Sequence, residues 1–592
     1  MEILNRYHNY ELHPETDVKG CDDSAWDGTA AVVSELRCRI REMQEERRKS
    51  GCGNRIVVSF DCYPGVDKEE ILSLAAQLDP TRVFDMEDYA KSEETLNREF
   101  ADYITDDRVF GVICHRKTED LFQKEKLQQA AEELADITEG VIVVAGLGTD
   151  LLCEADIWIW CSLTRWEAQL RYRAGMPNWH CTNTDDPILT KVKRGFFIEW
   201  RLADRYKKAR YELFDYVLDT EEKQHPKMAS AEAYRQGLRQ VSRKPFRMEP
   251  YFDPGVWGGK WMQKNFGLDP EQPNFAWSFD GVPEENCLNL RLGDTVLKMP
   301  AMDLVLYCPH ELLGERVHAR FGAEFPIRFD LLDTMGGGNL SLQVHPLTEY
   351  IQDTFGMHYT QDESYYLLDA DESEETYVYL GVKKDVDPAE MERDLNAAQR
   401  GEIQFPADKY VNKVPVKKHD HILIPAGTVH CSGKNTMVLE ISATPYIFTF
   451  KLWDWGRVGL DGLPRPIHIE HGMKNIQWDR DTDWIYDNLV GQAVTMEKGP
   501  GSEVERTGLH NREFIDTYRY TLSEAYEISM DDSVHVMNLV DGSHAYIEST
   551  DGSFEPFEIH YAETAIVPAA VGSYRIVPGE GEIKMIVASV RN

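Results

Sequence analysis

Four residues in three short segments of the sequence carry side chains that could bind one metal ion. Gln343 and His345 stand two apart in the segment LSLQVHP, and positions i and i+2 of a strand project to the same face. Glu363 follows in DESYY, and His430 ends IPAGTVH, where a Pro-x-Gly turn ends one strand and directs the histidine inward. Two imidazoles, a carboxylate and an amide oxygen suit Zn²⁺ or another borderline divalent cation, with room for water or substrate.

The order of the three segments, rather than any one residue, carries this prediction. The chain has 18 histidines, and a single histidine near a strand end is usually a surface residue or a satisfied core residue. Three segments in this order, each bounded by strand-like runs, are much more specific evidence for a metal site than any single histidine. We therefore predict that the four residues bind a metal ion inside a β-barrel.

The elements that must position these residues are short strands. After residue 250 the chain consists of strand-like runs separated by Gly, Pro and Asp turns, and from residue 532 onward it reads entirely as strand. Many short strands at regular spacing predict a β-barrel or sandwich. We predict two all-β domains, residues 241–490 with a polar helical insertion at 387–400, and residues 491–592.

The first 240 residues have a different pattern, in which apolar strands alternate with amphipathic helices. The predicted strands are 55–60, 109–114, 141–145 and 157–161, and the predicted helices are 69–78, 121–135 and a basic, aromatic stretch at 191–215. Strands separated by helices in this way predict a parallel α/β sheet. Residues 1–240 are therefore predicted to form an α/β domain, joined to the β domains by a linker near 241–254.

The metal-binding segments resemble those of type I phosphomannose isomerases, which are zinc-dependent cupin enzymes that interconvert mannose 6-phosphate and fructose 6-phosphate. The resemblance covers about residues 250 to 592, and further matching segments are 256–259, 325–326, 413–416, 453–457 and 464–468. It implies a jelly-roll double-cupin fold and one Zn²⁺ per chain, bound by Gln343, His345, Glu363 and His430. It also implies that Arg457 lies near the reacting carbons of a small phosphosugar substrate.

The residue types fit that chemistry. Aldose–ketose isomerisation moves a proton between C1 and C2 through a cis-enediol, and a metal ion lowers the cost of the developing negative charge by about several kcal/mol. Arg457, which stays protonated, can stabilise the same oxyanion. The sequence does not identify the general base that the reaction also needs.

Three positions depart from the pattern of the family. Gln361 and Asp330 stand where it commonly has lysines, so that two positive charges are missing, although Lys434, Lys451 or Arg328 could compensate. A glycine usually found at a turn is replaced by His419. Three functions therefore stay open: a mannose-6-phosphate isomerase, a non-catalytic metal-containing sugar-phosphate sensor, and a cupin isomerase for a different sugar.

The N-terminal part loosely resembles uridine-kinase-like P-loop proteins. The strand at 55–60 leads into the segment DCYPGVDKE and then a helix, where a phosphate loop would lie. A working loop needs glycines and a hydroxyl around its lysine, but Asp67 and Glu69 flank Lys68, and both carboxylates would repel phosphate. The resemblance thus implies a degenerate nucleoside-kinase-like domain without kinase activity.

Composition excludes several other classes of function. With 64 basic and 102 acidic residues the net charge is −38, which argues against a nucleic-acid partner. No apolar run approaches the roughly 18 residues of a membrane span, and the first residues lack the pattern of a signal peptide. Eleven cysteines without a CxxC pair predict reduced thiols in a cytoplasmic protein. The sequence leaves the oligomeric state open.

Overall fold

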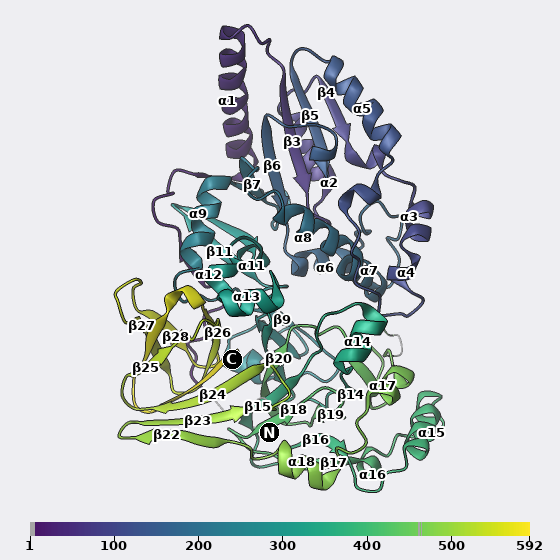
Figure 1. Ribbon diagram of the computed structural model, residues 1–592, viewed down its shortest axis with the longest axis vertical. Coiled ribbons are helices and arrows are strands. Elements are labelled where there is room, and N and C mark those ends of the chain that lie inside the picture. Colours follow the sequence, from purple (N-terminus) through teal and green to yellow (C-terminus); the bar gives the residue numbers. More distant parts are fainter. Residues whose placement is uncertain (1–5, 460–461, 463–464, 509, 592) are drawn as a thin grey trace. The chain divides into compact units, whose positions relative to one another are not determined.

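The computed structural model describes residues 6–459, 462, 465–508 and 510–591, which form two compact units (Figure 1). The α/β unit consists of Glu15–Val241 and Cys287–Cys308. The β-rich unit consists of Met1–Pro14, Ser242–Asn286 and Pro309–Asn592. Each unit therefore includes segments that are distant in the sequence. Among the described residues, no helix is long and apolar enough to cross a membrane.

A seven-stranded sheet forms the centre of the α/β unit. Its strands, in spatial order, are β2 (Ala25–Asp27), β8 (Lys227–Ser230), β7 (Tyr216–Asp219), β6 (Ile157–Ser162), β3 (Ile56–Cys62), β5 (Val141–Gly146) and β4 (Arg82–Asp85). The five strands from β7 to β4 pair in parallel, and β8 and β2 extend the sheet antiparallel. Every residue of β3, β5 and β6 is buried, as expected for parallel strands covered on both faces. The predicted parallel α/β sheet is confirmed.

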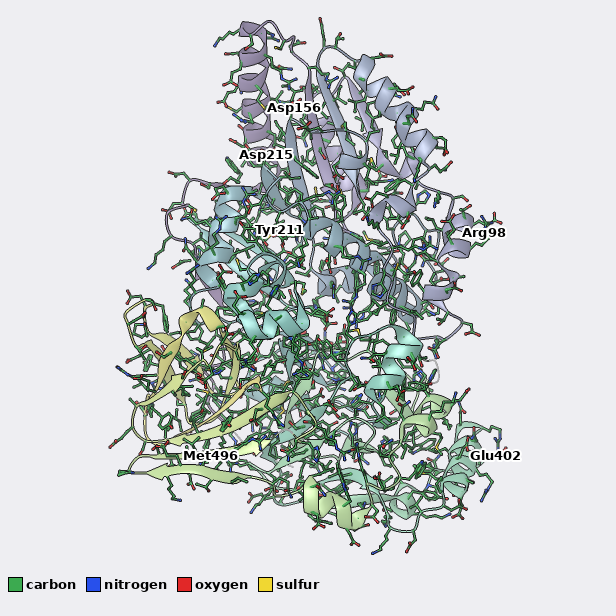
Figure 2. The ribbon with its side chains drawn as sticks, in the orientation of Figure 1. Arg98, Asp156, Tyr211, Asp215, Glu402 and Met496 are labelled. Atoms are coloured by element: carbon green, nitrogen blue, oxygen red, sulfur yellow. The ribbon has the colours of Figure 1, made fainter. Side chains whose placement is uncertain are left out.

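Two aspartates that Figure 2 labels help to fix the register of this sheet. Asp156, directly before β6, accepts a hydrogen bond of 2.8 Å from the backbone N–H of Val57 in β3. Asp215, directly before β7, accepts one of the same length from Trp158 in β6. Each aspartate thus accepts a hydrogen bond from an N–H group at the start of a neighbouring strand. Without the aspartate this N–H group would be left unpaired.

The predicted strand at 109–114 is wrong. This segment has no regular secondary structure, and the strand of the sheet that follows β3 in the chain is β4 instead. Its Val112 N–H donates to Tyr103 O and its Cys114 N–H to Phe197 O, so its backbone pairs with helical segments. Gly111 permits this close approach, because a Cβ there would lie 2.5 Å from Tyr103 O. A short apolar run cannot by itself distinguish a buried strand from another buried segment.

Residues 287–308 join the α/β unit through two strands and a helix. Strands β11 (Cys287–Leu292) and β12 (Thr295–Pro300) form a hairpin to which β1 (Glu15–Asp17) adds in parallel, and α11 (Met302–Tyr307) follows. The Asp303 carboxylate is buried, pairs with Lys207 at 2.5 Å and accepts a hydrogen bond of 2.6 Å from the Tyr234 hydroxyl. A buried ion pair that is completed by hydrogen bonds is costly to break, so this segment is held firmly.

The β-rich unit begins with a sandwich of two antiparallel sheets, called here the first sandwich. Its six-stranded sheet is β18 (His421–Ile424), β15 (Glu363–Ala370), β20 (Thr436–Ala443), β13 (Ile327–Asp333), β10 (Trp277–Gly281) and β9 (Tyr251–Asp253). Its five-stranded sheet is β17 (Val411–Pro415), β16 (Tyr377–Val382), β19 (His430–Ser432), β14 (Leu342–Val344) and β21 (Phe450–Trp453). The predicted helical insertion is confirmed as α15 (Pro388–Gln399).

A second sandwich follows near the C-terminus. Its six-stranded sheet is β22 (Val494–Gly499), β23 (Ser502–Gly508), β24 (Ile515–Leu522), β31 (Ile583–Val590), β26 (His535–Asp541) and β29 (Thr564–Val567). Its four-stranded sheet is β25 (Tyr526–Ser529), β30 (Ser573–Pro578), β27 (His544–Ser549) and β28 (Phe557–His560). One apolar core contains residues from both sheets, so the two sheets pack face to face.

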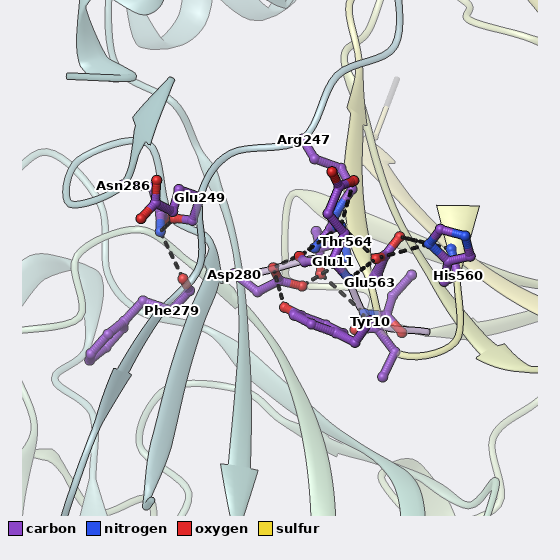
Figure 3. A network of polar contacts seen from close by, with 12 residues as sticks. Tyr10, Glu11, Arg247, Glu249, Phe279, Asp280, Asn286, His560, Glu563 and Thr564 are labelled. Atoms are coloured by element: carbon purple, nitrogen blue, oxygen red, sulfur yellow. Dashed lines mark hydrogen bonds and ion pairs between the residues drawn. The ribbon is translucent and has the colours of Figure 1, made fainter. Parts of the chain in front are cut away.

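A buried guanidinium joins the parts of the β-rich unit (Figure 3). Arg247 pairs with Glu563 of the second sandwich at 2.6 Å and with Asp280 of β10 at 3.7 Å. The chain near the N-terminus completes the network, since the Tyr10 hydroxyl donates to Asp280 at 2.8 Å and the Glu11 N–H donates to Glu563 at 2.7 Å. One charge thus connects four segments that are remote in sequence.

Removing one partner of this network should destabilise the β-rich unit. Glu563→Gln leaves the guanidinium of Arg247 without its closest counter-charge, and uncompensated buried charges cost about 3–5 kcal/mol. Urea unfolding followed by tryptophan fluorescence should show a loss of that size. The control Glu555→Gln changes an exposed carboxylate just before β28 and should stay within about 0.5 kcal/mol. Equal effects of the two changes would contradict the role given to Arg247.

Candidate metal centre

The predicted metal ligands meet between the two sheets of the first sandwich. Gln343 lies on β14 with His345 directly after it, Glu363 begins β15, and His430 begins β19. Glu363 Oε1 lies 3.3 Å from His345 Nε2 and pairs closely with His430 Nε2. The Gln343 amide nitrogen is 3.2 Å from His430 Nε2, and a half-turn of the amide places its oxygen there instead. The structure therefore brings all four residues together.

Backbone carbonyl groups hold both imidazole rings. His345 Nδ1 lies 3.4 Å from Phe448 O, and His430 Nδ1 lies 2.9 Å from Thr428 O. A carbonyl oxygen can only accept, so Nδ1 carries the proton in each neutral ring and Nε2 offers its lone pair to the centre. This is the arrangement by which proteins orient histidines that bind metals.

The centre is buried, and its polar atoms lack ordinary partners. At most 1% of the surface of His345, Glu363 and His430 is exposed. Within the described residues, the carboxylate oxygens of Glu363 and Nε2 of His345 have no hydrogen-bond partner apart from the close contacts of these ligands with one another. Leaving such atoms unpaired in the interior costs about 1–3 kcal/mol each, and more for a charged group. A cation bound by these atoms removes that cost, so the donor set fits a divalent metal ion.

The electrostatics of the centre agree with this fit. Burial raises the pKa of Glu363, but the imidazoles of His430 and His345, when Nε2 also carries a proton, outweigh burial and hold that pKa below its ordinary value. Burial alone would lower the pKa of His345. The Glu363 carboxylate has the larger, opposite effect, so the pKa of His345 is raised. Glu363 therefore remains a carboxylate and attracts positive charge to the centre.

Gln361 and Asp330, where the sequence resemblance places lysines, face the buried carboxylate of Glu440, which sequence reasoning missed. Arg328 pairs with Asp330 and, at 3.4 Å, with Glu440, which also accepts a hydrogen bond of 3.2 Å from the Gln361 amide. Burial raises the pKa of Asp330 to about 7 and that of Glu440 to about 8, against the opposing charge of Arg328. The signal in the sequence that could have revealed this carboxylate was Glu440 itself, an acidic residue inside the apolar run that forms β20.

Arg457 belongs to a cluster of charges after β21. Its guanidinium pairs with Asp454 and donates to Asn339 O at 2.8 Å, and Arg465 pairs with the same carboxylate at 2.6 Å. None of these contacts brings Arg457 to the metal ligands. Two guanidinium groups share one carboxylate, so the cluster keeps a net positive charge. Pro464, which belongs to a matched segment, lies outside the described residues.

Lys451 connects this cluster with the metal centre. It lies opposite Gln343 in the pairing of β14 with β21, and residues directly opposite in a sheet project to the same face. In the described part of the chain its ammonium group has no hydrogen bond or ion pair. Burial, helped by Arg465 and Arg457, lowers the pKa of Lys451 to about 7. It thus adds an unpaired amine beside the ligands.

His419 occupies a left-handed turn that favours glycine. Its φ is +72°, and the cost of that conformation is typically about 1–3 kcal/mol for a residue with a side chain. The ring compensates through contacts with the Tyr366 hydroxyl at 2.9 Å and with Asp541 of the second sandwich at 3.3 Å. The turn therefore forms with His419 at a position that favours glycine.

The predicted phosphate loop of the α/β unit is filled by the protein itself. Lys68 pairs with Asp85 at 2.9 Å and with Glu87 at 3.1 Å. Gly65 is packed against α6 (Arg165–Arg173), whose Arg171 donates to Gly65 O at 3.2 Å. The lysine that would bind phosphate is thus neutralised by two carboxylates.

Comparisons with known proteins match the two parts of the chain separately. Residues 30–243 match a family described as Domain of unknown function (DUF8485). A mannose-6-phosphate isomerase of Streptococcus mutans is 24% identical over 348 residues, which are 58% of this chain and 98% of that protein. Mannose-6-phosphate isomerase ManA of Bacillus subtilis is 25% identical over 240 residues, which are 40% of this chain and 69% of that protein.

Among solved structures, that of a mannose 6-phosphate isomerase from Bacillus subtilis is similar to this chain. Its TM-score is 0.46 at 19% sequence identity, and the match covers 58% of this chain and 99% of that one.

Changes to the ligands should remove the metal ion. We expect His345→Ala and Glu363→Gln each to reduce the metal bound at this centre to well below one per chain, because the first removes a donor and the second removes the charge. Plasma mass spectrometry of dialysed protein measures the total metal content, which should fall by about one ion per chain relative to the wild type. Glu372→Gln, on the exposed turn after β15, serves as the control and should keep the wild-type content. Full occupancy in both ligand variants would show that the ligand set is wrong.

Proposed function

We propose that the β-rich unit is a metal-dependent aldose–ketose isomerase that interconverts mannose 6-phosphate and fructose 6-phosphate, with a double-cupin fold. The observation that carries the proposal is the convergence of His345, Glu363 and His430 between two sheets. They lie in the part of the chain that is similar to the isomerases named above. The chemistry of that convergence and the similarity in sequence support the same activity.

We propose zinc as the metal, bound by Gln343, His345, Glu363 and His430. When bound, it would polarise the carbonyl and hydroxyl oxygens of the sugar and stabilise negative charge in the enediol. The two nitrogens and two oxygens of this set suit zinc better than magnesium or calcium, which prefer oxygen ligands alone. The surrounding strands exclude water, because the ligands are almost completely buried.

Lys451 has a pKa lowered to about 7, and we propose that it is protonated when an anion lies beside it and then supplies the positive charge that the replaced lysines would have carried. Arg328 is paired with Asp330 and Glu440, and Lys434 lies on the exposed surface 4.0 Å from Glu374. Lys451 has no such partner among the described residues and shares a face with Gln343. Together with Arg457 it can attract the anionic sugar phosphate against the negative charge of the protein as a whole.

A second candidate function is a sugar-phosphate sensor that binds metal and ligand without turnover. The observation in its favour is the Glu440 network, in which Gln361 donates an amide hydrogen bond and Asp330 pairs with Arg328. Neither position offers a cation to the reacting carbons. The sensor would bind mannose 6-phosphate to the metal-loaded protein but would not release fructose 6-phosphate.

The α/β unit is proposed to be a degenerate nucleoside-kinase-like domain that does not transfer phosphate. The support for this proposal is the pairing of Lys68 with Asp85 and Glu87 and the packing of α6 on Gly65. The place of a phosphate is thus taken by groups of the chain itself. An assembly or regulatory role for this unit fits these contacts better than catalysis.

The role of Lys451 can be tested with mannose 6-phosphate in an assay coupled to fructose 6-phosphate. Lys451→Met should raise KM or lower kcat/KM by about 10- to 150-fold, the effect of losing one charge-assisted contact. Lys434→Met removes an exposed lysine and should change kcat/KM by less than about twofold. If both variants equal the wild type, Lys451 does not contact the substrate.

Restoring a lysine distinguishes the enzyme from the sensor. Gln361→Lys places an ammonium group beside Glu440 and should raise kcat/KM for mannose 6-phosphate about tenfold if the chain is an isomerase. Gln361→Met, which adds no charge, is the matched control and should not gain activity. An absence of turnover in the wild type and in Gln361→Lys, while calorimetry still detects binding of mannose 6-phosphate, would favour the sensor.

A further inference from the structure

A second group of possible metal ligands lies outside the first sandwich, on helices α12 (Pro309–Leu313) and α13 (Glu315–Phe321). It consists of His310, Glu315 and His318, each of which offers one ligand atom within 4.8 Å of the other two. His310 Nδ1 lies 3.0 Å from Glu315 Oε1, and the two imidazole rings have their centroids 3.9 Å apart. We propose that these three residues bind a second divalent metal ion of the zinc type.

The backbone that carries the three residues is fixed before any metal binds. Gly314 between them has φ of +87°, and a Cβ at this position would lie 2.5 Å from Asp532 O, so a glycine is required. The Asp532 carboxylate accepts hydrogen bonds of 2.9 Å from the N–H groups of Glu315 and Arg316 at the start of α13. The turn between the ligands is therefore fixed by the loop before β26.

Further contacts attach α13 to the end of the chain. The Arg316 guanidinium donates to Arg591 O at 2.7 Å and to Val590 O at 3.1 Å, and α12 packs on the turn η5 (Ala569–Val571). A site whose ligands are held by such contacts loses little conformational entropy when the ion binds. The scaffold is thus organised for binding.

The donor set selects the class of metal. Two imidazoles and one carboxylate suit zinc and its neighbours in the first transition row, whereas calcium and magnesium prefer oxygen ligands. Three protein ligands leave coordination positions for water, and the site is reachable from solvent, since 51% of the His310 side chain and 75% of the Glu315 side chain are exposed. The net charge of −38 raises the local concentration of cations.

The proposed site is independent of the metal centre in the first sandwich and of the proposed function. None of its ligands belongs to that centre. Binding would tie α12 to α13, and both helices contact the second sandwich. The bound ion should therefore stabilise this part of the fold, because it binds the folded arrangement and not the unfolded chain.

Zinc stoichiometry of the full chain tests the proposal. After equilibrium dialysis against zinc, plasma mass spectrometry should find two zinc ions per wild-type chain, one in His345→Ala and one in His310→Ala/His318→Ala. The control His544→Ala changes a half-buried histidine of β27 and should keep two. A His310→Ala/His318→Ala variant that binds as much zinc as the wild type would overturn the proposal, whatever the occupancy of the centre in the first sandwich.

A measurement of stability separates loss of the ion from loss of the fold. In the His345→Ala background only the proposed site remains, and added zinc should raise the unfolding temperature. The rise should vanish when His310→Ala and His318→Ala are also present, while the unfolding temperatures in EDTA stay equal. An equal rise with and without the two histidines would place the ion elsewhere and refute the site.

Discussion

The carboxylate of Glu363 is the charge on which the candidate site of this protein depends. It is completely buried, and among the described residues its close polar contacts are the two histidine rings, so positive charge stabilises it. Two imidazoles approach it from the opposite sheet, and each is turned by a backbone carbonyl so that Nε2 faces the carboxylate. The two packed sheets thus enclose a carboxylate and two imidazole nitrogens that together favour the binding of a cation.

The charges around this centre are balanced differently on its two sides. On the side of Glu440, the single guanidinium of Arg328 faces two carboxylates and the Gln361 amide donates to one of them, so the described residues there offer no spare positive charge to a ligand. On the side of β21, Lys451 is unpaired within the described part of the chain, and two arginines share Asp454. An anionic ligand is therefore favoured near β21, and this asymmetry gives the proposed substrate an orientation.

The β-rich unit depends on a second buried charge. Arg247 has its counter-charges on both sandwiches, and the segment before β1 closes the network with Tyr10 and Glu11. In the same way, Asp303 holds residues 287–308 in the α/β unit through Lys207. Both units are therefore assembled from segments distant in sequence, and in each a buried ion pair fixes the distant segment.

The sequence by itself determined the features that arise from neighbouring residues. The spacing of Gln343 and His345 predicted their common face, the fully apolar runs predicted β3, β5 and β6, and the polar helical pattern predicted α15. These features follow from local periodicity, since side chains alternate in a strand and repeat every 3.6 residues in a helix.

Only the tertiary structure decided what depends on distant contacts. Residues 109–114 are as apolar as a strand but pair with helical segments. Burial and the nearby charge of Glu363 raise the pKa of Glu440, although the two residues are 77 positions apart in the sequence. His310 and His318 meet because Gly314 breaks the helix between them and Asp532 fixes the turn. Burial and electrostatic interaction are set by the neighbours that folding supplies, and no local pattern contains them.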